Sequence, residues 1–194
     1  MATQSLAPTL LLAAPRLADP NFERRVVLLG KHEPDGALGW VLNGPALDPV
    51  GQLLQAADLV PAGVQVPRTA PFRKAARVGG PVTPESGWLI YPNGGPRFDG
   101  EIEVGEELLV CSNAAALDAV VRGREPRQFR LVLGYAGWDA GQLEAELREG
   151  VWLPAALEPS LVFETDPDSL WDVAFQQATG GMATTFNGKT WGLA

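Results

Sequence analysis

Cysteine and histidine are scarce in this sequence of 194 residues, which contains one of each. The single cysteine, Cys111, cannot form an internal disulfide or a metal site of several cysteines, and this is typical of a protein in a reducing compartment. The single histidine, His32, excludes a metal site of several imidazoles and a catalytic triad built on any other histidine. We therefore assign no catalytic residue, no metal and no cofactor, and we predict a cytoplasmic location.

Long hydrophobic runs and excess positive charge are missing as well. The longest apolar run near the start, residues 10–14, is too short for a membrane span or a signal peptide, so we predict no export and no membrane association. The net charge is −8. Residues 139–172 hold nine acidic residues and one basic residue, Arg148, so this segment alone carries that charge. Attraction to a phosphate backbone is disfavoured, and we predict no direct binding to nucleic acid.

The remaining composition is that of a globular protein, with 46% hydrophobic and 20% charged residues. The 22 glycines and 17 prolines are spread along the chain, and no internal repeat or low-complexity linker divides it. These features predict a single domain over residues 1–194. The tail 179–194 is rich in Gly and Thr, and we expect it to be poorly ordered.

Hydrophobic runs and turn residues predict a mixture of strands and helices. Apolar runs bounded by turn residues predict strands at residues 9–14, 25–31, 36–43, 75–78, 88–91, 107–111, 129–133 and 161–163, with turns at 79–81 and 83–87. Helical spacing and capping residues predict helices at 50–58, 113–122, 139–149 and 166–178. The pattern favours an α/β or α+β domain around a mixed sheet.

The two scarce residues each allow two interpretations. His32 lies beside Glu33 in an expected turn, where it is either an acid–base group or, more commonly, a solvent-exposed histidine with no fixed partner. Cys111 ends an apolar strand just before an expected helix start at Ser112. A thiol near a helix N-terminus can be redox-sensitive, but a cysteine in an apolar strand is more often a small core residue.

The strongest local pattern is Gly-Tyr-Ala-Gly-Trp-Asp-Ala-Gly at residues 134–141. It lies between an expected strand and a capped helix, where free backbone N–H groups can bind a phosphate or a carboxylate. The glycine spacing matches neither the dinucleotide fingerprint nor the P-loop, and Asp139 at the helix start would repel an anion. The alternative is a tight turn packed over Tyr135 and Trp138.

Glycine-rich turns and basic residues supply the other candidates. The turn at residues 79–81 can bring backbone close to a ligand. The candidate ligand-binding residues are therefore His32, Asn43, Gly79, Gly80, Gly134, Tyr135, Gly137 and Trp138. Two basic groups could meet an acidic partner or a phosphate, or could simply form solvated surfaces: Arg68, Arg73, Lys74 and Arg77, and Arg122, Arg124, Arg127 and Arg130.

Taken together, the motifs resemble the YqgE/AlgH family of bacterial proteins over residues 7–178. The matching segments are residues 11–15, 19–22, 36–43, 79–82, 87–91, 133–138, 141–147 and 161–165. The resemblance implies a single α/β domain whose bent mixed sheet forms a pseudo-barrel flanked by helices. The sequence departs from the family pattern at Lys31-His32-Glu33 and in the tail 182–194.

The family is uncharacterised, and one branch is named for a presumed transcriptional regulator of alginate production. This resemblance and the scarcity of catalytic groups favour a non-enzymatic cytoplasmic regulatory or binding protein, with an indirect effect on any transcription it controls. Its partner would be a protein or a small ligand. The alternative hypothesis is an enzyme, or a switch that binds a nucleotide or small anion, with a pocket near the Gly79-Gly80 and Gly134–Trp138 turns.

Overall fold

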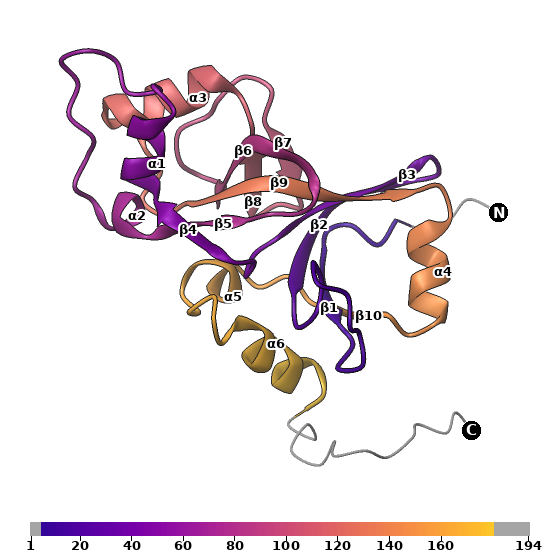
Figure 1. Ribbon diagram of the computed structural model, residues 1–194. Helices are drawn as coiled ribbons and strands as arrows, with labels where there is room; N and C mark the ends of the chain where they lie inside the picture. The colour runs from indigo at the N-terminus through magenta and orange to yellow at the C-terminus, as the bar shows by residue number, and fades with distance from the viewer. Residues whose placement is uncertain (1–4, 181–194) are drawn as a thin grey trace.

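A computed structural model describes residues 5–180, which form one curled sheet of ten strands with short helices around it (Figure 1). The strands are β1 Thr9–Ala13, β2 Val26–Glu33, β3 Gly36–Val41, β4 Ala46–Pro49, β5 Ala75–Val78, β6 Val82–Pro92, β7 Ile102–Val104, β8 Leu108–Cys111, β9 Arg130–Asp139 and β10 Trp152–Ala155. The helices are α1 Val50–Ala56, α2 Ala70–Arg73, α3 Ala114–Ala119 with the wider turn η1 Val120–Arg124, α4 Gln142–Arg148, α5 Pro159–Phe163 and α6 Leu170–Ala178.

Strand β9 organises the sheet because it pairs with three other strands. The main order is β10-β1-β2-β3-β9-β6-β8-β7, with antiparallel neighbours, and β5 joins β9 in parallel and β4 in antiparallel pairing. The second half of β9 pairs with β3, and its first half pairs with β6 and β5. The result is a mixed α/β single domain with a half-barrel sheet, which confirms the fold expected from the sequence.

The sheet buries side chains on both faces. Leu10 and Leu12 of β1 point into one cluster of buried residues, while Leu11 and Ala13 point into another, as the two-residue period of a strand requires. Helices α5 and α6 cover the first cluster and α4 covers the second, while α1, α2 and α3 cover a third cluster at the far end of β6, β8 and β9 (Figure 1). No helix within residues 5–180 is long and apolar enough to cross a membrane.

Two predicted turns and one predicted strand are wrong. At both turns, the hydrogen-bonded pairing of the sheet continues through the turn residues. Residues 83–87 lie inside β6, where a register shift between Val82 and Gly87 against β9 takes up the extra residues as a bulge. Residues 134–138 lie inside β9 and not in a turn. Residues 161–163 form helix α5 instead of a strand, because Pro159 starts a helical turn that buries all three side chains.

Helix starts also differ from the prediction at three places. Helix α4 begins at Gln142 and not at Asp139, which is the last residue of β9, and the residue before the helix, Gly141, offers no side-chain cap. Asn113, and not Ser112, caps α3, since its Oδ1 accepts a hydrogen bond from the N–H of Ala115 at 2.8 Å. Helix α6 begins at Leu170, after a turn in which the Asp166 carboxylate accepts from the N–H of Asp168 at 2.9 Å. Strands β4, β7 and β10 were not predicted. Most of the tail 179–194, from residue 181, lies outside the described residues.

A carboxylate between two indole rings holds α4 against the sheet. Glu146 Oε2 accepts hydrogen bonds from Nε1 of Trp138 on β9 at 2.8 Å and from Nε1 of Trp152 on β10 at 2.7 Å. The two rings meet edge to face, with centroids 5.9 Å apart. Because β9 and β10 are separated by β3, β2 and β1, this single carboxylate ties together strands from distant parts of the sheet.

Two glycines allow β9 to bend where the β5–β6 connection crosses it. A Cβ added at Gly80, whose φ is +152°, would lie 2.1 Å from the carbonyl carbon of Tyr135. A Cβ added at Gly134, whose φ is +75°, would lie 2.3 Å from the carbonyl oxygen of Gly80. Only glycine fits at these positions, so the crossing accounts for both residues by packing alone.

Replacing Glu146 with Ala is expected to lower the free energy of unfolding by about 2–4 kcal/mol, because two nearly buried indole N–H groups lose their acceptor. Trp138 and Trp152 are 6% and 4% exposed. Glu146→Gln keeps an acceptor and should cost less than Glu146→Ala. Urea denaturation followed by tryptophan fluorescence measures both, with the exposed Glu149→Ala as control; equal losses for Glu146→Ala and Glu149→Ala would contradict the assignment.

Replacing Gly80 with Ala is expected to destabilise the protein by at least about 3 kcal/mol more than replacing Gly94, because the new methyl group meets rigid backbone. Gly94 is the matched control, since its φ is also positive, +99°, and a Cβ there meets nothing within 4 Å. Thermal and urea unfolding of the two variants check the difference. Similar stabilities would show that the crossing tolerates a side chain.

Candidate functional site

The glycines predicted to converge do converge, but their backbones fill the space between them. Gly79 N–H donates to the carbonyl of Leu133 at 2.6 Å, and Gly80 packs against Tyr135. Within residues 5–180, none of the five main cavities is lined by Gly79, Gly80, Gly134, Tyr135, Gly137 or Trp138. That these residues bind a ligand stays a prediction. The alternative is that they serve packing alone and that Trp138 serves its hydrogen bond to Glu146.

His32 lies in strand β2 and is only 7% exposed, so its predicted place in an exposed turn is wrong. Its Nδ1 accepts a hydrogen bond from the N–H of Leu6 at 3.1 Å, and its Nε2 lies 3.2 Å from Oε1 of Glu144 on α4. His32 thus connects the N-terminal segment to α4, and it lines none of the five main cavities.

Cys111 is a core residue of β8. Its side chain is buried beside Leu89 and Leu109, and its thiol lies 3.7 Å from the carbonyl oxygen of Asp99. Burial raises the pKa of the Cys111 thiol, which keeps it protonated at neutral pH. Of the two interpretations of this residue, the structural one therefore fits its surroundings.

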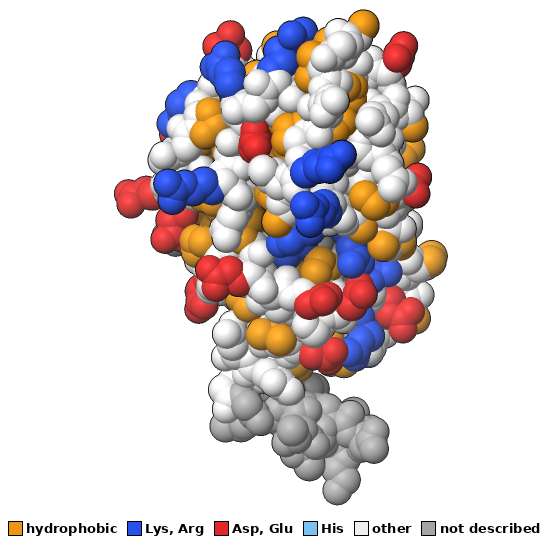
Figure 2. Space-filling model, turned by 90° about the vertical axis from the view of Figure 1, so that its left-hand side faces the viewer, with side chains coloured by type: hydrophobic (Ala, Val, Ile, Leu, Met, Phe, Trp, Pro, Cys, Tyr) orange, Lys and Arg blue, Asp and Glu red, His pale blue; other side chains and the backbone are white. Residues whose placement is uncertain are grey.

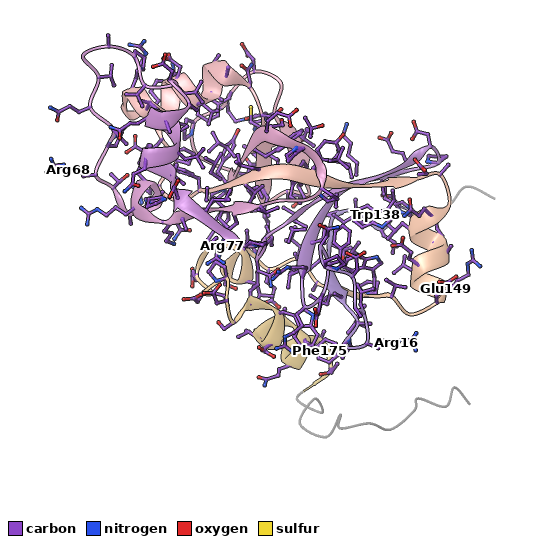
Figure 3. All side chains as sticks on the ribbon, viewed as in Figure 1. Arg16, Arg68, Arg77, Trp138, Glu149 and Phe175 are labelled. Atoms are coloured by element: carbon purple, nitrogen blue, oxygen red, sulfur yellow. The ribbon has the colours of Figure 1, made fainter. Side chains whose placement is uncertain are left out.

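The two basic groups of the sequence meet at one cavity. Strand β5 pairs in parallel with β9, and this pairing brings Arg77 and Lys74 from the first group to Arg130 from the second. The three side chains line a cavity of about 360 Å³ between these strands and the segment 163–168. The other members of both groups are exposed: Arg68, Arg73, Arg122, Arg124 and Arg127. Figure 3 shows Arg77 at the junction of β5 and α5, while Arg68 projects away from the molecule.

The walls of this cavity, called here the Arg130 cavity, are of two kinds. Apolar side chains from α1, α2, α5, β9 and the residue before β9 form one part: Val50, Pro71, Phe163, Leu131 and Phe129. Exposed carboxylates stand on the other side: Glu164, Asp166 and Asp168. Lysine and arginine side chains gather in the middle of this face of the molecule, directly above a row of acidic side chains (Figure 2). The cavity therefore combines apolar walls with desolvated positive charge.

Arg130 is held by backbone carbonyls and not by a carboxylate. Its Nε donates to the carbonyl of Val162, and its Nη2 donates to the carbonyl of Thr165 at 2.9 Å. Burial and, to a smaller extent, the positive charge of Arg77 lower the pKa of the Arg130 guanidinium to about 10. Arg130 is still charged at neutral pH, so two positive charges face the same cavity.

Arg77 is half-buried and incompletely paired. Its Nη1 donates to Oδ1 of Asp168 at 2.7 Å and to the carbonyl of Gly44 at 3.2 Å. Its Nε is buried and has no hydrogen-bond partner within the described residues. The side chain of Arg77 is 13% exposed, whereas that of Asp168 is 79% exposed. A desolvated cation therefore depends on a carboxylate that water reaches freely, and such pairs contribute little stability.

A second cavity of about 440 Å³, called here the Arg25 cavity, adjoins the first. Arg77, Pro167 and Asp168 line both cavities, and Arg24 and Arg25 line only the second. Asn43 also lines it, the one candidate residue of the sequence that reaches a main cavity of the described chain. Its side chain accepts from the N–H of Val26 at 2.8 Å and donates to the carbonyl of Arg24 at 2.9 Å. Asn43 thereby fixes the segment that carries both arginines.

The acidic segment of the sequence supplies the counter-ions of this face. Asp168 pairs with Arg77, and Asp172 pairs with Arg24 at 2.6 Å while the Arg24 guanidinium lies over the ring of Trp171. The sequence does not predict that the two basic groups and the acidic segment share one surface. The two basic groups come together through the pairing of β5 with β9, which no local sequence pattern encodes.

Within residues 5–180, no three His, Cys, Asp or Glu side chains are grouped to hold a metal ion.

Comparisons with known proteins identify the family. The profile of the AlgH-like family, DUF179, matches residues 10–183. A UPF0301 protein of Anaeromyxobacter sp. strain K is 38% identical over 179 residues, which cover 91% of this chain and 89% of the relative. A UPF0301 protein of Alcanivorax borkumensis is 36% identical over 174 residues, which cover 90% of this chain and 89% of that protein.

Two solved structures share the fold. The solution structure of the AlgH protein from Pseudomonas aeruginosa covers 98% of each chain with a TM-score of 0.73 and 31% identity. The crystal structure of a Corynebacterium diphtheriae protein covers 91% of this chain and 89% of its own, with a TM-score of 0.69 and 24% identity, and it speaks for the fold alone. The resemblance seen in the motifs is therefore confirmed, and the chain belongs to the AlgH-like UPF0301 family.

Proposed function

We propose that this protein is a non-enzymatic regulatory protein of the cytoplasm that binds a carboxylate or phosphate group of its ligand or partner in the Arg130 cavity. Any effect on transcription would be indirect. The name of the AlgH relative, with the family's presumed regulator of alginate production, supports the regulatory part of the proposal. The binding part is supported by the site itself.

The meeting of Arg77 and Arg130 at one cavity carries the proposal. Each guanidinium is withdrawn from water, and the charge of Arg77 contributes to the lowered pKa of Arg130. An anion between them would offset this repulsion, and its charge-assisted hydrogen bonds would compensate for the hydration that both groups have lost. Lys74, at the same cavity, adds a flexible positive charge. The apolar wall of Phe129, Phe163 and Leu131 would contact the rest of the ligand.

The proposed anion site is the Arg130 cavity, whereas the sequence suggested a site near the Gly79-Gly80 and Gly134–Trp138 segments. Backbone atoms occupy the space between those glycines. A ligand there would have to separate β9 from the β5–β6 connection. The Arg130 cavity offers positive charge and open volume without such a change.

Inorganic phosphate is expected to bind the protein with a dissociation constant of about 1 mM, and the variant Arg77→Gln is expected to bind at least about ten-fold more weakly, because charge-assisted bonds to a guanidinium are lost. Isothermal titration calorimetry at constant ionic strength measures both. Arg68→Gln is the matched control, since Arg68 is exposed and lines neither arginine cavity. Equal phosphate binding by wild type and Arg77→Gln would refute the proposed site.

Random duplex DNA is expected not to bind at sub-micromolar concentration, even at 50 mM salt. The net charge of −8 opposes a polyanion at low salt, and the longest helix of residues 5–180, α6, carries Asp172 and no basic residue. Fluorescence anisotropy with a labelled duplex checks this. Salt-sensitive binding below 1 μM would contradict the indirect role.

A further inference from the structure

We infer that the Arg130 cavity and the Arg25 cavity form one continuous site for a ligand that carries two anionic groups, such as a molecule with linked phosphates. Each cavity would receive one group, and Arg77 would contact both. This inference rests on the proposed function, because it takes the Arg130 cavity as the first anion site. It goes further by naming the second site and the class of ligand.

The two cavities share part of their lining at Arg77. Its side chain lines both of them, together with Pro167 and Asp168. A ligand that reaches across this point can bind in both cavities at once. The second group then binds at a high effective concentration, so a linked ligand gains affinity without any new kind of contact.

Backbone carbonyls of two consecutive residues accept hydrogen bonds from Arg25 and Arg77. Arg25 Nη1 donates to the carbonyl of Asn43 at 3.0 Å, and Arg77 Nη1 donates to the carbonyl of the next residue, Gly44, at 3.2 Å. The chain is fixed at this point, because a Cβ at Gly44 would lie 2.0 Å from the carbonyl oxygen of Val78. Two guanidinium groups are therefore positioned before any ligand binds, which reduces the ordering cost of binding.

The charges of Arg25 and Arg77 are poorly compensated. The Nε atoms of both are buried without a hydrogen-bond partner in the described part of the chain. No carboxylate within residues 5–180 pairs with Arg25. The acidic residues that line the two cavities are all exposed at the rim: Glu23, Glu164, Asp166, Asp168 and Asp172. Water screens these carboxylates more strongly than it screens the half-buried arginines, so the interior of the joint site attracts anions.

Asp168 occupies the position between the two cavities that a linked ligand would use. Its Oδ1 lies 2.7 Å from Arg77 Nη1, and within residues 5–180 Asp168 forms an ion pair with Arg77 alone. A ligand bridging the cavities would replace this carboxylate at Arg77. Asp168 is thus an internal competitor, and its removal should strengthen binding.

The test compares inorganic phosphate with tripolyphosphate by isothermal titration calorimetry on the full chain at constant ionic strength. Tripolyphosphate is expected to bind with one-to-one stoichiometry and at least about ten-fold more tightly than phosphate. Arg25→Gln should remove most of this advantage and leave phosphate binding nearly unchanged. The exposed control Arg68→Gln should leave both unchanged, and Asp168→Asn should tighten tripolyphosphate binding several-fold.

The outcomes separate the inference from the proposed function. An equal tripolyphosphate advantage in Arg25→Gln and Arg68→Gln would overturn the joint site, while loss of phosphate binding in Arg77→Gln would still uphold the first site. Phosphate binding that Arg77→Gln does not weaken would overturn both. Circular dichroism checks that each variant folds. Should Arg25→Gln not fold, Arg24→Gln removes a positive charge that lines only the Arg25 cavity, and the same loss of the tripolyphosphate advantage is expected.

Discussion

Strand β9 has to satisfy three partners at once, and its bend at Gly134 makes this possible. Residues 130–135 of β9 pair with β6 and β5, and residues 136–139 pair with β3. The bend brings the Gly134 backbone against Gly80 so closely that neither position admits a side chain. Because β5 runs parallel to β9 through this crossing, Arg77 and Arg130 come to the same cavity. The packing of two glycines thus determines where the charged site forms.

The packing of α4 shows how a glycine-rich and aromatic motif can be explained without a ligand. Residues 134–147 supply the bend of β9, the indole of Trp138, the capping amide of Gln142 and the carboxylate of Glu146. Gln142 Oε1 accepts from the N–H of Asp139 at 3.0 Å, and its Nε2 donates to Glu146 at 2.8 Å. The indole of Trp138, the amide of Gln142 and the carboxylate of Glu146 each have a partner within the fold, so hydrogen bonds and packing are the structural explanation of the pattern that looked most like a binding loop.

Local sequence patterns predicted the parts of the fold that local chemistry determines. Alternating or continuous apolar residues located β1, β2 and β3, and the pair Asp139 and Gln142 located α4. The curled sheet itself followed from the family resemblance. The segment 161–163 was missed because a buried run of three apolar residues suits a strand and a short helix equally well. The burial of His32 was not predicted, because its contacts Leu6 and Glu144 are distant in sequence.

The site illustrates why the net charge of a chain does not decide what it binds. The charge of −8 comes from residues 139–172. Two aspartates of this segment, Asp168 and Asp172, pair with Arg77 and Arg24 at the two cavities. At physiological salt a charge acts over roughly 8 Å, so an incoming group responds to the nearest residues and not to the whole molecule. The rim carboxylates are solvated and form weak pairs that an anion can replace at small cost. Arg25, Arg77 and Arg130 are partly buried, and under the proposed function an anion that reaches them would gain more than it loses at the rim.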